Sequence, residues 1–152
     1  MLHSHIKIFL HIVWSTKDRQ PLLNRNARSS IQEHLLKNAI ENGIAIDAIA
    51  VQPDHVHLLL AYKSDQKLEQ IMQLIKGESS HWANSQNLLE GKFAWQRGYG
   101  AFSVSQSHVE RVKEYIRTQD EHHRTKSFGE EYAAILRKYG FAANETDESV
   151  SE

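Results

Sequence analysis

Two histidines, His55 and His57, are spaced so that both side chains could bind one divalent metal ion. They lie in the run PDHVHLLL at residues 53–60. Residues two apart in a β-strand project from the same face of a sheet, so both imidazoles would reach one point in space, whereas a helix would separate them. A zinc site usually has three or four protein ligands, so a metal site here needs a further ligand from elsewhere in the chain.

The histidine pair also has a purely structural interpretation. The chain contains ten histidines, and His3 and His5 show the same spacing near the N-terminus. The strand context nevertheless favours a functional role. Val56 and Leu58 would supply the apolar face of the strand on the opposite side. The two histidines are then not needed for that core, and a polar function explains their presence better.

A tyrosine and a glutamine could complete such a site. Tyr115 and Gln119 lie four residues apart in a segment with helical periodicity, which places them on one face, one turn apart. Val109, Val112 and Ile116 form the apolar stripe of this segment, and Tyr115 lies off that stripe. Gln119 can offer an amide oxygen to a metal ion, with the phenolic oxygen of Tyr115 beside it. Taken alone, a tyrosine at a helix margin is usually structural.

The composition is that of an ordinary globular protein. The chain has 152 residues, of which 40% are hydrophobic and 24% charged, enough to form a core. It has no cysteine, which excludes disulfides, thiolate zinc sites and cysteine nucleophiles and fits a reducing compartment. We find no apolar run of membrane-spanning length and no signal-peptide pattern, and therefore expect a cytoplasmic protein without a membrane partner.

The charge of the chain is unevenly distributed. The net charge of −1 does not by itself indicate a nucleic-acid binder. Residues 143–152 contain four carboxylates and no basic residue, so residues 1–142 carry a net charge of +3. We expect residues 1–142 to form a single domain and residues 143–152 to be an acidic, disordered tail.

Apolar periodicity predicts four strands and a set of amphipathic helices. The predicted strands, rich in β-branched and aromatic residues, are 6–17, 44–51, 55–62 and about 99–104. A tight turn at Pro53-Asp54 joins the second and third strands into a hairpin. The predicted helices are one that ends at Asn42-Gly43, one from Leu68 through Trp82, one at about 107–123 and a short one at 130–138. Ser107 and Glu110 predict a capping box at the start of the helix that carries Tyr115.

The order of these elements predicts the fold class. Strand, helix, strand, strand, helix, strand and helix is the order of the ferredoxin-like split βαβ fold, of the α+β class. We therefore expect an antiparallel sheet covered by helices on one face, plus a C-terminal helix that carries the tyrosine.

Five blocks of the chain resemble the HUH single-tyrosine transposases of the insertion-sequence-200-like family. The blocks occur in the family's order, and the match that includes them covers nearly all of residues 6–122. They are HIVWSTK at 11–17 followed by RQP at 19–21, PDHVHL at 53–58, LIKG at 74–77, WQRGY at 95–99 and YIRTQ at 115–119. The histidines precede the tyrosine, as they do in transposases and rolling-circle initiators.

The resemblance implies a phosphoryl-transfer site. His55, His57 and Gln119 are then the ligands of Mg²⁺ or Mn²⁺, and Tyr115 is the nucleophile. The ion would polarise an oxygen of the scissile phosphate. Attack by the tyrosine would leave a 5′-phosphotyrosine link and a free 3′-OH, and a second 3′-OH could reseal the DNA without ATP.

The resemblance also implies a substrate and a partner. The substrate would be single-stranded DNA with hairpins, and the chain would form a homodimer with active sites shared between subunits. The candidate phosphate contacts are Lys17, Arg19, Lys76, Arg97 and Arg111. The candidates for base stacking are Trp14, Trp82 and Trp95, with core packing as the alternative for each.

Two other functions remain open from the sequence. A catalytically silent or domesticated relative would hold DNA or RNA hairpins without cutting them. A metal-dependent phosphodiesterase that uses water would not need Tyr115. The joint presence of the two histidines, the tyrosine and the glutamine argues against lost catalysis.

Overall fold

Four strands form one open antiparallel sheet in the order β2-β3-β1-β4. The structure is a computed structural model and describes residues 3–142. The strands are β1 (Ile8–Ser15), β2 (Ala45–Val51), β3 (His55–Tyr62) and β4 (Gly100–Val104). Because β3 lies between β1 and β2, the two strands that the first helix connects are parallel and separated by one strand. This is the predicted split βαβ arrangement.

The helices occur in the predicted order along the chain. They are α1 (Arg25–Glu41), α2 (Leu68–Met72), α3 (Glu78–Ser85), α4 (Val109–Arg117), α5 (Gln119–His122) and α6 (Phe128–Lys138). Short 3₁₀ turns, η1 (Lys17–Arg19) and η3 (Gln106–His108), precede α1 and α4, and a π-helical turn, η2 (Gln73–Gly77), joins α2 to α3. The helix predicted from Leu68 through Trp82 is thus nearly continuous.

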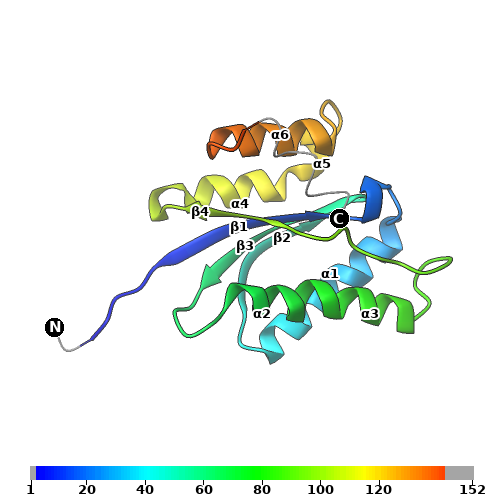
Figure 1. Cartoon of the computed structure of the whole chain (residues 1–152), viewed down its shortest axis with the longest axis horizontal. Helices are drawn as coiled ribbons and strands as arrows, with labels where there is room; N and C mark the ends of the chain where they lie inside the picture. Colours follow the sequence, from blue (N-terminus) through cyan, green and yellow to red (C-terminus); the bar gives the residue numbers. More distant parts are fainter. Residues whose placement is uncertain (1–2, 143–152) are drawn as a thin grey trace.

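The two faces of the sheet carry different helices (Figure 1). On one face, Val56 and Leu58 belong to the main core together with residues of α1, α2 and α3. On the other face, Leu59 of β3 packs with Val109 and Ile116 of α4. The predicted apolar stripe of the tyrosine helix is therefore confirmed, and the histidine face of β3 is the face that α4 and α6 cover.

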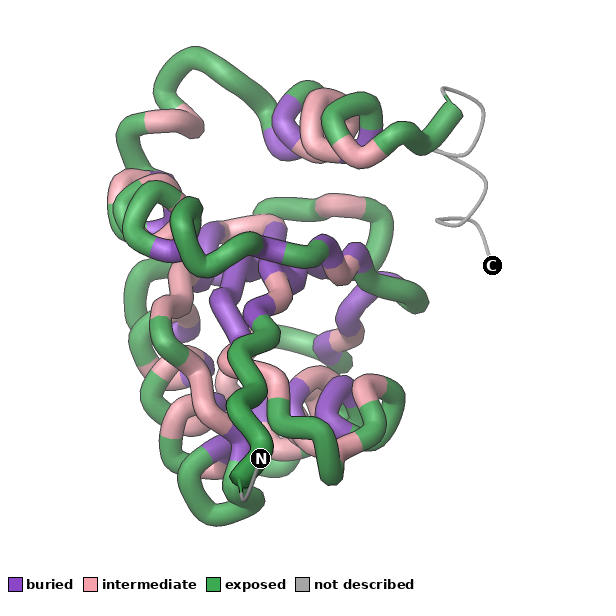
Figure 2. The backbone as a smooth tube through the Cα atoms, turned by 90° about the vertical axis from the view of Figure 1, so that its left-hand side faces the viewer, coloured by how far each residue is buried: buried purple, intermediate pink, exposed green. Residues whose placement is uncertain are grey.

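A small cluster of its own holds α6 on the sheet. Phe128 and Leu136 of this helix pack on Val13 and Phe102 of the strands. Figure 2 shows buried backbone along the strands and on the sheet-facing side of α6, with exposed backbone on the outside of the molecule. The last helix is thus part of the folded domain and closes the side of the sheet on which the histidines lie.

Local sequence signals explain where α1 begins and ends. The side chain of Asn24 accepts a hydrogen bond from the backbone N–H of Ala27, which is the usual N-cap contact. Gly43 has a φ of +68°, in the left-handed region that favours glycine after a helix C-terminus. The predicted end at Asn42-Gly43 is therefore confirmed.

The predicted capping box at Ser107 and Glu110 is wrong. The hydroxyl of Ser107 lies 3.1 Å from Nδ1 of His108, and η3 intervenes before α4. A capping contact occurs instead at α6, where the hydroxyl of Ser127 accepts a hydrogen bond from the backbone N–H of Glu130. The four-residue pattern was present twice, and local sequence did not distinguish the two places.

The helix predicted over 107–123 is divided rather than continuous. Thr118 separates α4 from α5, and its hydroxyl donates to the carbonyl oxygen of Glu114 at 2.9 Å. Such side-chain bonds compete with the helical backbone pattern and often bend a helix. Within residues 3–142, no helix is long and apolar enough to cross a membrane. The predicted acidic tail, residues 143–152, lies outside the described residues.

Candidate active site

The two histidines of β3 are fully buried and aim the same ring nitrogen at one place. Both have an exposed fraction of 0%, and their ring centroids are 5.0 Å apart. Nδ1 of His55 donates to the carboxylate of Asp54 at 2.6 Å, and Nδ1 of His57 shares a 2.8 Å hydrogen bond with Nε2 of His11. These outer contacts fix the orientation of both rings and leave Nε2 of each directed toward the helices, as metal-binding histidines require.

The segment around α5 contributes two more side chains to this place. Oε1 of Gln119 lies 3.3 Å from Nε2 of His55, so the structure brings the predicted glutamine to the predicted histidine. His123 follows α5 directly, and its Nε2 lies 2.9 Å from the same amide oxygen. His123 was not predicted. Its spacing of four residues from Gln119 on a helix was the signal that could have identified it.

Glu131 of α6 connects all of these groups. Its Oε1 lies 2.9 Å from Nε2 of His57, 3.2 Å from Nε2 of His123 and 3.5 Å from Nε2 of His55. Its Oε2 accepts a hydrogen bond from Nε2 of Gln119 at 3.1 Å. The side chain is buried, with an exposed fraction of 3% for the residue. The signal that could have identified Glu131 is its spacing, three residues after Phe128 and four before Ile135, which puts a carboxylate on the apolar face of a helix. Only tertiary packing brings that face to the histidines.

Tyr115 also reaches the cluster within the same chain. Its hydroxyl donates a hydrogen bond to Oε2 of Glu131. Its ring is half-buried, stacks on His122 with centroids 4.7 Å apart and contacts the edge of His57 at 5.7 Å. The nucleophile predicted from the sequence therefore lies beside the predicted metal ligands, with a carboxylate between them.

The charges of the cluster are strongly coupled. Burial would raise the pKa of Glu131, but hydrogen bonds from His55 and His57 outweigh it and hold this pKa far below its usual range. Burial and the Glu131 carboxylate together raise the pKa of Tyr115 well above its ordinary value. The site thus contains a carboxylate anion and a phenol that retains its proton.

The three histidines of the sheet respond differently to their surroundings. Burial lowers the pKa of His55, but hydrogen bonds to Asp54 and Glu131 outweigh it and the net shift is upward. Burial lowers the pKa of His57, and burial together with the neighbouring His57 lowers the pKa of His11 to about 3. The neutral state of His57 and His11 is the state that a metal ligand and its supporting group require.

A polar connection ties the glutamine segment to the rest of the domain. Asp120, directly after Gln119, accepts hydrogen bonds from Arg28 of α1 at 3.0 Å and from Gln52 at 3.1 Å. Arg28 in turn donates to the backbone carbonyl of Val51 at 2.8 Å. The start of α5 is therefore joined to α1 and to the end of β2, which positions Gln119 against the histidines.

The predicted phosphate contacts fall into two groups. Lys76 and Arg97 line a groove of about 390 Å³ beside η2, and Nζ of Lys76 donates to the carbonyl of Gly98 at 2.7 Å. Arg19 lines a smaller neighbouring pocket with Arg97, and Lys17 is exposed in η1 close by. Arg111 does not join them, because it lies on α4 in the groove that contains Tyr115.

Core packing explains two of the three tryptophans. Trp14 and Trp95 are buried in the main core, with exposed fractions of 2% and 8%. Trp82 is half-buried and stacks on His34, with ring centroids 4.1 Å apart. The alternative interpretation therefore holds for Trp14 and Trp95, and base stacking must use other rings.

Known proteins resemble this chain in sequence and in fold. A family described as "Transposase IS200 like" matches residues 4–119. The ISDra2 transposase TnpA of Deinococcus radiodurans is 27% identical over 114 residues, which are 72% of this chain and 81% of that protein. Two solved structures resemble the fold. One, assigned to the transposases of Deinococcus radiodurans R1, has a TM-score of 0.62 and 26% identity over 78% of this chain and 98% of that one.

The second structure is that of a REP-associated tyrosine transposase bound to a REP hairpin. It has a TM-score of 0.61 and 17% identity, and it covers 81% of this chain and 73% of that one. At this identity the likeness concerns the fold, an open four-stranded antiparallel sheet with helices on both faces.

Proposed function

Because this chain belongs to the IS200-like transposase family, we propose that it cuts and rejoins single-stranded DNA with Tyr115 as the nucleophile. The observation that carries the proposal is the contact between the Tyr115 hydroxyl and a buried cluster that contains His55 and His57. A tyrosine used only for packing has no need to reach a carboxylate shared by three histidines. The same groups at one place are what covalent catalysis on a phosphodiester requires.

Each step of the reaction that we propose exchanges one ester bond at phosphorus for another. The Tyr115 oxygen attacks the phosphorus in line and the bond to the 3′-oxygen breaks. The products are a 5′-phosphotyrosine link and a free 3′-OH, and the proton lost by the phenol is balanced by the proton gained at the 3′-oxygen. Glu131 accepts the hydrogen bond of that phenol and so orients the attacking oxygen. Attack by a second 3′-OH reverses the step and rejoins the DNA.

The donor set of the cluster fits a divalent metal ion. The ligand atoms of His55, His57, His123 and Glu131 all lie within 4.8 Å of one another, and Gln119 adds an amide oxygen. Such an ion supplies charge stabilisation at the scissile phosphate. Imidazole nitrogens suit transition-metal ions, whereas Mg²⁺ prefers a shell of oxygens. We therefore propose that this site binds Mn²⁺ in preference to Mg²⁺.

We propose hairpin-containing single-stranded DNA as the substrate. The REP-associated relative is bound to a REP hairpin, and this chain presents a basic surface formed by Lys17, Arg19, Lys76 and Arg97. Phosphate contacts of this kind position a nucleic acid without reading its sequence. Arg111 contacts the strand at a different place, near the nucleophile.

The test is the formation of a covalent protein–DNA adduct. A labelled hairpin strand from the DNA that flanks the coding sequence is incubated with the protein and Mn²⁺ and is then separated under denaturing conditions. We expect an adduct with the natural protein and with Tyr62→Phe, a matched change far from the site, and no adduct with Tyr115→Phe. Strand cleavage that persists in Tyr115→Phe would instead support a phosphodiesterase that uses water. Binding without cleavage would support a silent hairpin-binding protein.

The predicted homodimer with shared active sites is tested by mixing two inactive variants. Tyr115→Phe lacks the nucleophile and His57→Ala lacks a metal ligand. Because Tyr115 contacts the histidine cluster of its own chain, we propose that each chain acts alone and that the mixture stays inactive. Recovery of adduct formation in the mixture would establish the shared arrangement.

A further inference from the structure

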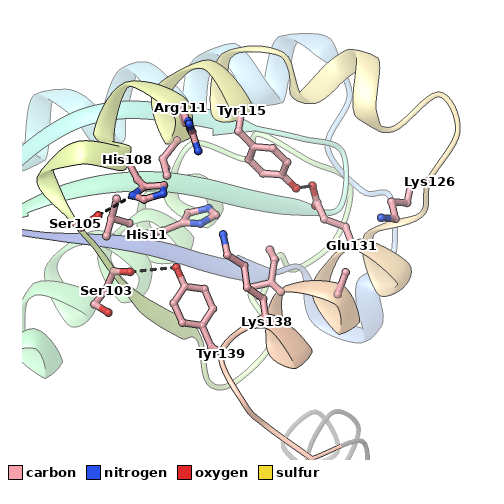
Figure 3. Close-up of a pocket in the computed structure, with 14 residues that line it drawn as sticks. His11, Ser103, Ser105, His108, Arg111, Tyr115, Lys126, Glu131, Lys138 and Tyr139 are labelled. Carbon is pink, nitrogen blue, oxygen red and sulfur yellow. Dashed lines mark hydrogen bonds between the residues drawn. The ribbon is translucent and has the colours of Figure 1, made fainter.

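A groove between α4 and α6 leads to the hydroxyl of Tyr115. It has a volume of about 740 Å³, within the roughly 300–1,000 Å³ range of pockets that hold small ligands. His11 of β1 and the serines at the end of β4 form its floor, and the two helices form its walls. Figure 3 shows Tyr115 and Glu131 meeting at one end of the groove and Tyr139 with Ser103 toward the other.

Three cationic side chains line this groove. They are Arg111 of α4, Lys126 of the segment before α6, and Lys138 at the end of α6. All three are exposed, and within residues 3–142 none of them has a carboxylate at salt-bridge distance. The carboxylate that lines the groove, Glu131, is bonded to the histidines. Lys138 contacts a ring instead, with its Nζ 5.7 Å from the centroid of Tyr139. The groove therefore attracts anions.

The groove also contains two rings in fixed positions. Tyr139 stacks on Phe102 with centroids 4.8 Å apart, and its hydroxyl donates to the carbonyl of Ser103 at 3.0 Å. Nδ1 of His108 lies 2.7 Å from the hydroxyl of Ser105. A ring held in this way loses little conformational entropy when another flat group stacks on it. Cations and aromatic rings along one groove are the combination that binds single-stranded nucleic acid.

We propose that the groove between α4 and α6 binds single-stranded DNA next to the phosphate that Tyr115 attacks, with Arg111, Lys126 and Lys138 on backbone phosphates and Tyr139 or His108 against a base. The proposal rests on the proposed function for the identity of the strand. Its physical basis is separate and consists of exposed cations without a carboxylate partner, fixed rings and continuity with the nucleophile. The groove thereby differs from the surface around Lys76 and Arg97, which we assign to the hairpin.

Binding of an oligothymidine of about twelve nucleotides tests the charge of the groove. Fluorescence anisotropy gives its affinity as a function of salt concentration. Each lost phosphate contact on a single strand lowers the salt slope by about 0.7, which corresponds to about five-fold weaker binding at 0.1 M salt. We expect this change for Arg111→Gln and for Lys138→Gln, and about twenty-five-fold for the double variant. Lys37→Gln removes the same charge from an exposed position of α1 and should change neither the affinity nor the salt slope.

Cross-linking tests the place of binding. An oligonucleotide that contains 5-iodouracil is irradiated with the protein, and the modified peptides are identified by mass spectrometry. We expect cross-links at Tyr139 or His108. Cross-links confined to the surface of Lys76 and Arg97, or groove variants that bind as tightly as Lys37→Gln, would overturn the proposal.

These outcomes are distinguishable from failure of the proposed function. Adduct formation at Tyr115 together with unaltered DNA binding by the groove variants would support the proposed function and contradict DNA binding in the groove. Weakened binding by the groove variants without any adduct would support DNA binding in the groove and contradict the role of Tyr115 as the nucleophile.

Discussion

The hydroxyl of Tyr115 donates a hydrogen bond to the carboxylate of Glu131. The two residues lie on different helices, α4 and α6, and the same carboxylate also contacts three histidines. Glu131 therefore connects the proposed nucleophile to the proposed metal ligands. A change at Glu131 should therefore affect both the nucleophile and the metal ligands.

Glu131→Gln should lower the pKa of Tyr115. Burial and the adjacent carboxylate raise this pKa together, so removal of the negative charge takes away one of the two upward causes and shifts the value back toward 10. The ultraviolet absorbance of the phenolate, followed during alkaline titration, measures the change. The Tyr115→Phe protein identifies which of the five tyrosines is responsible. An unchanged titration in Glu131→Gln would show that the carboxylate does not act on this phenol.

Mn²⁺ should stabilise the folded protein, and a chelator should reverse the effect. An ion at about one hundred times its Kd adds about 2.7 kcal/mol to the free energy of unfolding. The thermal unfolding midpoint with Mn²⁺, Mg²⁺ or EDTA measures this stabilisation. His123→Ala should reduce it, whereas His81→Ala, an exposed histidine of α3, should not. Equal stabilisation of the two variants would exclude His123 as a ligand.

Asp120→Asn should weaken metal binding more than it weakens the fold. Asp120 is exposed and its ion pair with Arg28 lies at the surface, so its contribution to stability should stay below about 1 kcal/mol. Its contacts with Arg28 and Gln52 hold the residue next to Gln119, and loss of such supporting contacts typically costs about ten-fold or more in metal affinity. Calorimetric titration with Mn²⁺ measures the affinity. Asp47→Asn, an exposed aspartate of β2, is the control.

Hairpin binding should weaken as pH rises through about 8. Burial lowers the pKa of the Lys76 ammonium from 10.5 to about 8, so its positive charge is present at neutral pH and is lost above pH 8. A phosphate contact favours the charged form, so binding in this range takes up a proton. The affinity of a hairpin oligonucleotide, measured from about pH 7 to pH 9, should fall less in Lys76→Arg, which keeps its charge.

The same lysine should affect folding stability with the opposite sign. Between about pH 8 and 10.5 the unfolded chain binds more protons at Lys76 than the folded chain does. The free energy of unfolding therefore rises with pH through this window as far as Lys76 contributes. Urea unfolding of the natural protein and of Lys76→Arg across the window measures this difference, and identical pH profiles would contradict it.

Two glycine substitutions should act in opposite directions. A Cβ at Gly100 would lie 2.7 Å from the ring of Phe102 and 2.8 Å from the hydroxyl of Tyr132. Gly100→Ala should therefore displace α6 and cost about 1–3 kcal/mol. At Gly77 nothing lies within 4 Å and the backbone is helical, so Gly77→Ala should stabilise by up to about 1 kcal/mol. Urea unfolding of the two variants checks both signs.

The sequence by itself determined the order of the elements and half of the site. Strand periodicity is local, because alternate side chains of one strand face the same way. It therefore predicted β3 (His55–Tyr62) and the shared face of its histidines. Helical spacing in turn placed Gln119 one turn after Tyr115. The predictions of a continuous helix over residues 107–123 and of a capping box at Ser107 were wrong, because local side-chain hydrogen bonds of Thr118 and Ser107 formed instead.

Only the tertiary structure decided which groups complete the cluster. Glu131 lies on a helix whose contacts with the sheet, through Phe128 and Leu136, are made with strands far away in the sequence. Periodicity places Glu131 on the apolar face of α6 with Phe128, but it does not reveal that this face meets three histidines. The groove that contains Arg111 and Lys138 depends in the same way on the separation of two helices. Local patterns predict the direction of side chains, and the packing of distant elements decides what those side chains meet.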